Sequence, residues 1–302
     1  MKDLQTVLGL GAIRHALKMH MHTKIMYELS DGFERDLFAA VHKNLEEKSN
    51  PLRLNNFSYA MRELTRHVLY RLSPDDNVVQ CSWYKNETNK ANGITRKQRA
   101  FYAVQGGLDD SYVENILRLN VKDIHNNLIK AINNLSKFTH IEPDSFDQSE
   151  DAVNELVLKT SDAFFCFLST IKECRNLVID QLYENIDSAV IDEILSTTIQ
   201  SIDEFTSHYY IDEVYTDNVK IIAIDHESVI FRATGTVYCE LQWGSNSDIR
   251  RGDGAILPEK FSFACELISP VDQPNEVETV EDSLVVDTRS WQEARYGIDE
   301  KA

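Results

Sequence analysis

The segment "VKIIAIDHESVIFRATGTVYCELQW", residues 219–243, carries apolar side chains at every second position on both sides of a short polar break. A period of two is typical of a β-strand with one buried face. The break at residues 225–228 has the composition of a hairpin turn, and Gly235 predicts a bend or a bulge. "KFSFACELI", residues 260–268, continues the pattern after a polar loop. Residues 214–302 therefore predict a small antiparallel β domain, with an acidic tail of little pattern beyond Pro270.

Upstream of this segment, apolar residues recur every three to four positions, which is the spacing of an amphipathic helix. One expected helix covers residues 55–72 and ends before Pro74, and another covers residues 120–138. Residues 142–213 predict an acidic helical hairpin, whose second helix would begin at Asp187 as its N-cap. The fold class that follows is α+β: an N-terminal helical bundle over residues 1–213, then the antiparallel β domain.

Charge divides the chain unevenly, although the total is −18. Residues 1–141 hold 20 Lys and Arg against 15 Asp and Glu, whereas residues 142–217 hold 3 against 18. An acidic protein binds nucleic acid poorly through nonspecific attraction. Only the basic part, residues 1–141, is therefore expected to offer a face to nucleic acid.

Composition also argues against several classes of protein. No run approaches the roughly 18 to 20 apolar residues that a membrane span needs, and the N-terminal residues do not have the pattern of a signal peptide. We therefore expect a cytoplasmic protein that does not bind a membrane. The five cysteines form no CxxC pair, which predicts reduced thiols and no structural metal site. We expect no metal and no other cofactor.

The segment "MRELTRHVLYRL", residues 61–72, places Arg62 five positions before His67. Arginine can hold a phosphate and histidine can transfer a proton near neutral pH, so the pair suits a metal-independent ribonuclease. The pattern resembles that of the HEPN superfamily of ribonucleases, in which four to six residues separate the two. His140, just after a helix in "NNLSKFTHI", residues 133–141, is a third catalytic candidate.

The Arg/His pattern is not specific in this chain. With 15 Arg and 9 His, about one match is expected by chance. Positions five apart lie about 140° apart around a helix, so Arg62 and His67 should flank its solvent-exposed face. They could share a phosphate through a homodimer that pairs two copies of the helix. Four pairs fit the pattern: Arg14/His20, Arg35/His42, Arg62/His67 and Arg118/His125.

Cations alternate with aromatic residues in "VVQCSWYKNETNKANGITRKQRAFYAVQGGL", residues 78–108. Cations bind phosphates and aromatic faces stack on bases, so this segment predicts a nucleic-acid-binding surface. An ordinary long loop with a basic rim is the structural alternative. A second basic loop, "GSNSDIRRGDG", covers residues 244–254. The predicted binding residues are Lys85, Arg96, Arg99, Tyr102, Arg250 and Arg251.

Several phrases together resemble the predicted nucleases encoded beside prokaryotic PIWI-related proteins in defence loci. The likeness covers about residues 50–145 and 219–268. It implies a nuclease or a nucleic-acid-associated role in defence against phage or plasmids, with a protein partner from the same operon. The phrases are "NPLRLNNFSYAMRELTRHVLYRLSP", "CSWYKNE", "TRKQRAFYAVQGGL", "LSKFTHI" and "LQWGSNSDIRRGDG".

Three functions follow from these patterns. The first is a metal-independent endoribonuclease that uses Arg62 with His67 or His140, with RNA as the favoured substrate. The second is a metal-dependent nuclease in the β domain, where Asp225 and Glu240 echo the paired acids that bind Mg²⁺, although Gln242 stands where a Lys is needed. The third is a non-catalytic, partner-binding or regulatory subunit of a bacterial defence complex, whose acidic residues 142–217 would bind a basic protein.

Overall fold

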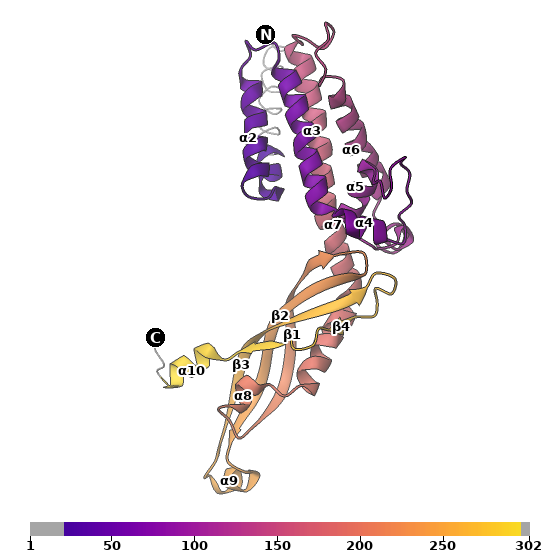
Figure 1. The fold of residues 1–302 in the computed structure, drawn as a ribbon. Helices are drawn as coiled ribbons and strands as arrows, with labels where there is room; N and C mark the ends of the chain where they lie inside the picture. Colours follow the sequence, from indigo (N-terminus) through magenta and orange to yellow (C-terminus); the bar gives the residue numbers. More distant parts are fainter. Residues whose placement is uncertain (1–20, 297–302) are drawn as a thin grey trace, which may run out of the picture. The chain divides into compact units, whose positions relative to one another are not determined.

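The computed structural model describes residues 21–296, so Arg14 and His20 lie outside the described residues. These residues belong to two compact units, one ending at Arg175 and the other beginning at Asn176 (Figure 1). The first unit is helical, and the second contains an antiparallel sheet. The predicted fold class, a helical region followed by a small antiparallel sheet, is confirmed.

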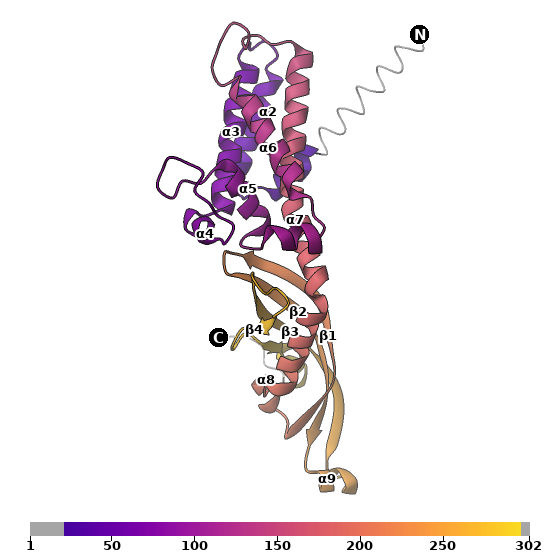
Figure 2. The same ribbon diagram turned by 90° about the vertical axis from the view of Figure 1, so that its right-hand side faces the viewer.

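The first unit is a bundle in which α2, α3, α6 and the first part of α7 lie side by side (Figure 1 and Figure 2). Helix α3 is central, because it contacts α2, α5 and α6. Its Phe57, Leu64 and Val68 are fully buried, as their spacing predicts. The helices of this unit are α2 (Phe33–Glu46), α3 (Arg53–Leu72), α4 (Asp75–Gln80), α5 (Arg96–Gln105), the π-helical turn η1 (Tyr112–Ile116), α6 (Val121–Ser136) and the start of α7 (Glu150–Ser196).

Helix α5 begins where the sequence provides a capping box. The Thr95 hydroxyl accepts from the backbone N–H of Gln98, and the Gln98 side chain accepts from the N–H of Thr95. The helix ends at Gly106, whose positive φ of 57° suits a residue without a Cβ. These two ends fix Arg96 and Lys97 in the first turn, where both are exposed.

Helix α7 corrects the expectation of a helical hairpin, because residues 150–196 form one continuous helix. Asp187 lies within this helix and caps nothing. The reason is readable in the sequence: the segment contains neither Gly nor Pro, and an unbroken row of buried apolar residues recurs every four positions. This row is Val178, Leu182, Ile186, Val190 and Ile194.

The second unit is built on three long antiparallel strands in the order β1–β2–β3, with β4 and β5 paired to β3. Strands β2 and β3 pair without a break from Ser228↔Pro270 to Trp243↔Ala255. The pairing of β1 with β2 shifts at three irregularities, near residues 212, 217 and 222. The elements are α8 (Gln200–Asp203), β1 (His208–Ile224), β2 (Ser228–Trp243), α9 (Asn246–Arg251), β3 (Ala255–Pro270), β4 (Glu278–Thr279), β5 (Val285–Asp287) and α10 (Arg289–Tyr296).

One expectation about the sheet is met and another needs correction. Gly235 does mark a bulge, which lies in the opposite strand: the pairing of β1 shifts between Thr216 and Asn218, against Gly235, and a Cβ there would lie 2.0 Å from the Tyr215 carbonyl oxygen. The segment beyond Pro270 is not unpatterned, since β5 pairs with β3 and Trp291 of α10 stacks on Phe205 at 4.3 Å. The predicted hairpin turn at residues 225–228 does join β1 and β2.

Over residues 21–296, no helix combines the length and the apolar character needed to cross a membrane.

Candidate nucleic-acid interface

Arg62 and His67 point to different parts of the bundle. Arg62 Nη1 donates to Thr139 Oγ1 at 3.2 Å, beyond the C-terminal end of α6. The His67 ring instead meets the edge of Phe33 at 4.8 Å, and its Nε2 lies 3.2 Å from Arg66 Nη2. The two side chains therefore diverge within one chain, as the angular spacing on α3 predicts.

The face of α3 that carries Arg62 also carries Asn55 and Ser58, at positions that lie one above another on a helix. Asn55 Nδ2 donates to the Phe138 carbonyl at 2.9 Å. Three buried atoms of this face have no hydrogen-bond partner among the described residues: Arg62 Nε, Asn55 Oδ1 and Ser58 Oγ. Buried polar atoms without a partner are uncommon in folded proteins, so this side of α3 has unused hydrogen-bonding capacity in its interior.

His140 follows Thr139 directly, and its side chain is exposed. Its carbonyl accepts from Ser145 Oγ at 2.9 Å, which fixes the backbone of the connection to α7. Because Arg62 contacts Thr139, its guanidinium lies next to the residue that precedes the exposed His140. Arg62 and His140 are 78 positions apart in the sequence. One group of this kind can neutralise a phosphate and the other can transfer a proton.

The two other described Arg/His pairs contribute to the fold instead. Arg35 bonds Asp31 and the Leu29 carbonyl, while His42 packs against Phe38 at 4.7 Å. His125 is completely buried, and its ring lies 4.4 Å from that of Phe101.

Burial, assisted by the nearby charge of Lys97, lowers the pKa of His125 to about 4. A neutral ring enclosed in this way cannot exchange protons with a substrate.

The loop before α5 and the first turn of that helix expose a group of cations. Lys85, Lys90, Arg96 and Lys97 are exposed, and none of them forms an ion pair with a carboxylate within residues 21–296. Lys97 Nζ lies over the Phe101 ring at 5.7 Å. Four unpaired cations so close in sequence are available to an anionic ligand.

Arg99 and Tyr102 were predicted to bind nucleic acid, but both side chains are buried. Arg99 is 4% exposed: it donates to the Ser73 carbonyl at 2.9 Å, pairs with Asp75 at 2.7 Å and lies over the Tyr70 ring at 3.7 Å. Tyr102 is 5% exposed, and its hydroxyl accepts from Asn77 at 3.0 Å. Both lie on the buried face of α5, where they hold α4 and the end of α3.

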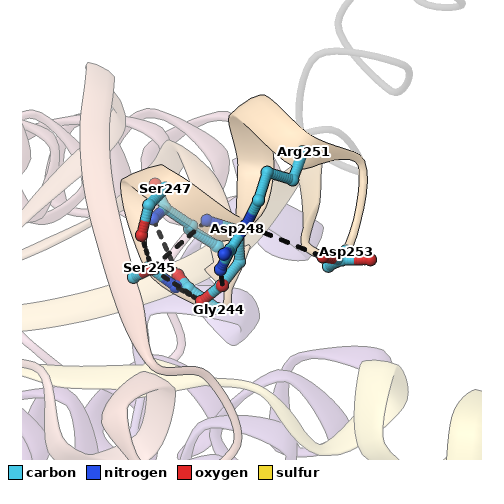
Figure 3. A network of polar contacts seen from close by, with 7 residues as sticks. Gly244, Ser245, Ser247, Asp248, Arg251 and Asp253 are labelled. Carbon is cyan, nitrogen blue, oxygen red and sulfur yellow. Dashed lines mark hydrogen bonds and ion pairs between the residues drawn. The ribbon is translucent and has the colours of Figure 1, made fainter.

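The second basic loop is internally neutralised (Figure 3). Arg251 pairs with Asp248 at 2.6 Å and with Asp253 at 3.8 Å. Hydrogen bonds from Ser245, and then from Arg251, lower the pKa of Asp248. Of the two arginines in this loop, Arg250 is exposed and forms no ion pair within residues 21–296, whereas Arg251 is paired. The loop therefore offers one unpaired cation where two were predicted.

The β region does not assemble the predicted pair of metal-binding acids. Asp225 Oδ1 accepts from the backbone N–H groups of Glu227 and Ser228, so it shapes the hairpin turn. Glu240 lies twelve residues beyond Ser228 on the continuous strand β2, about 40 Å away at about 3.3 Å per residue. Gln242 bonds the Gly244 carbonyl and Asn246. The alternative of a metal site formed by these two acids is therefore wrong. No cluster of three or more potential metal ligands occurs within residues 21–296.

One surface was missed by the sequence interpretation. The outward face of α6 exposes Lys130 and Lys137 among four asparagines. The helical spacing of these polar residues in the sequence indicates this face, opposite the apolar residues that predicted the helix.

Two family models, both described as "Predicted pPIWI-associating nuclease", match the chain over residues 26–163 and 171–292. No curated protein and no solved structure matches it. Neither matching model is described as a HEPN ribonuclease, so that likeness stays a prediction.

Proposed function

The chain belongs to the predicted pPIWI-associating nucleases, and on this premise we propose that it is an endonuclease that cleaves a phosphodiester bond without a metal ion. RNA is the favoured substrate. An RNA strand carries its own nucleophile, the 2′-hydroxyl, next to the phosphate, so a base and a cation suffice to cleave it. The family description also implies a PIWI protein as partner, and we place the reaction in defence against phage or plasmids.

The observation that supports this proposal is the contact of Arg62 with Thr139, which directly precedes the exposed His140. His140 would remove the proton of the 2′-hydroxyl, whose oxygen bonds to phosphorus as the bond from phosphorus to the 5′-oxygen breaks; the 5′-oxygen leaves with a proton from water, and Arg62 would balance the charge that grows on the phosphate.

His67 is the second catalytic candidate, and it requires a homodimer. The face of α3 next to it is open to solvent, with Tyr59 62% and Tyr70 51% exposed. Two copies paired through this face would place His67 of one chain near the other chain. Arg66, which contacts His67 and Glu63, would then be the cation beside it.

The test is digestion of single-stranded RNA and DNA in EDTA by wild-type protein and by His140→Ala, His67→Ala and His208→Ala. His208 is an exposed histidine of the second unit and is the matched control. We expect RNA cleavage that survives EDTA and is lost only in His140→Ala. Loss in His67→Ala alone, with a dimer in solution, would move the site to α3. Cleavage that disappears with EDTA would refute the metal-independent mechanism.

A second candidate function is supported by the charge of the second unit. Residues 176–302 hold 8 Lys and Arg against 26 Asp and Glu, whereas residues 1–175 hold 23 of each. The whole net charge of −18 therefore belongs to the second unit. Such a surface suits a basic protein partner. If no digest shows cleavage, and a PIWI protein from the same operon binds in a salt-sensitive manner, the chain is a regulatory subunit.

A further inference from the structure

The outward face of α6 is rich in lysine and asparagine. Three lysines and four asparagines share an arc of about 140° around the helix, opposite the apolar face. The only acid in this arc is Asp123. The exposed residues are Lys122, Asp123, Asn126, Asn127, Lys130, Asn133, Asn134 and Lys137.

The two charged side chains at the start of α6 already have partners within the first unit. Lys122 pairs with Glu114 at 2.6 Å, and Asp123 accepts from Asn120 at 2.9 Å. Lys130 and Lys137 form no ion pair with any carboxylate within residues 21–296. The rest of the face is therefore cationic and amide-rich. Lysines attract phosphates, and asparagine amides both donate and accept hydrogen bonds, as base edges require.

Cationic groups also lie near both ends of α6. The helix packs against α5, whose first turn carries the exposed Arg96 and Lys97. At the other end, Lys137 is two residues from Thr139, the partner of Arg62. The helix has 16 residues and so extends about 24 Å, the length of about seven nucleotides of a stacked strand. Figure 1 and Figure 2 show α5 beside α6 within the bundle.

We propose that this face binds a single strand of RNA and leads its phosphates from the basic loop to Arg62 and His140. The inference rests on the proposed function and identifies its substrate as single-stranded. A single strand suits the surface because asparagine can reach Watson–Crick edges only where the bases are unpaired. Lys130 and Lys137 would contact phosphates, and the asparagines would contact bases or sugars.

The test is fluorescence anisotropy with a labelled 12-nucleotide RNA, in EDTA and in a His140→Ala background that keeps the probe intact. Lys130→Gln/Lys137→Gln should weaken binding at least tenfold. It should also lower the slope of log affinity against log salt by about 1.4, because two phosphate contacts of a single strand are lost. Asn126→Ala/Asn133→Ala should weaken binding without changing that slope.

The matched control is Lys24→Gln/Lys43→Gln, which removes two exposed lysines of the same unit that, within residues 21–296, also form no ion pair with a carboxylate. The proposal is overturned if the α6 lysine variant binds like this control, or if the parent chain does not bind the probe. It is also overturned if the α6 variants lose affinity for an RNA duplex but not for the single strand. Cleavage by the His140→Ala chain would instead count against the proposed catalytic residue and leave the binding result intact.

Discussion

The buried histidine of α6 makes the stability of the first unit depend on pH. Burial lowers the pKa of His125 to about 4, from an ordinary value of 6.5. Below pH 6.5 the unfolded chain gains a proton at this ring that the folded chain does not, so stability falls as the pH falls and levels off near pH 4. At pH 5 the unfolded ring is almost fully protonated and the folded ring is about one-tenth protonated, which corresponds to a loss of about 2 kcal/mol.

The measurement compares urea unfolding of wild type and His125→Leu at pH 7.5 and pH 5, followed by circular dichroism at 222 nm. Leucine cannot take up a proton, so the variant should gain about 2 kcal/mol relative to wild type between the two pH values. His140→Leu is the control, because its ring is exposed in the folded chain, and it should follow wild type. If His125→Leu lost stability on acidification as steeply as wild type, the ring could not be buried and neutral as described.

Two further predictions concern residues that the fold holds in place. Arg99→Met should destabilise the first unit by about 3 kcal/mol, because the buried Ser73 carbonyl loses its donor and Tyr70 loses its cation. Arg96→Met, at an exposed position, should change it by less than about 0.5 kcal/mol in the same urea titration; equal stability of the two variants would contradict a structural role for Arg99. Gly235→Ala should destabilise the second unit by at least about 3 kcal/mol, since its Cβ would meet the Tyr215 carbonyl. Fluorescence of Trp243 and Trp291 during unfolding reports this, and an unchanged midpoint would show that β1 and β2 can separate locally.

Periodicity predicted most of the fold. The buried positions of α3 and the alternation along β2 follow directly from the spacing of apolar residues. The hairpin predicted for residues 142–213 does not form, because the row of buried apolar residues continues past the local cap residue Asp187. In a helix of 47 residues, side-chain packing decides continuity, and an Asp at one position does not end it.

The candidate site was less predictable, because composition does not distinguish a buried cation from an exposed one. Arg96 and Arg99 lie one turn apart on the same side of α5, yet Arg96 is exposed and Arg99 is buried, because only Arg99 is covered by Ser73, Asp75 and Tyr70. The contact of Arg62 with Thr139 links residues 77 apart in the sequence, and no local pattern encodes it. The divergence of Arg62 and His67, in contrast, follows from helix geometry alone.

The three register shifts of β1 bear on how the protein behaves at high concentration. Strand β1 ends the sheet, so its outer edge presents backbone N–H and C=O groups over up to 17 residues. A straight edge of that length would template strands of neighbouring molecules and lead to fibres. The shifts interrupt the regular row of donors and acceptors. Beside the shift near residue 217, the Tyr183 hydroxyl donates a hydrogen bond to the Thr216 carbonyl, which is then no longer free to pair with another strand. Regularising β1 by deleting one inserted residue should therefore raise aggregation while leaving the helical unit folded.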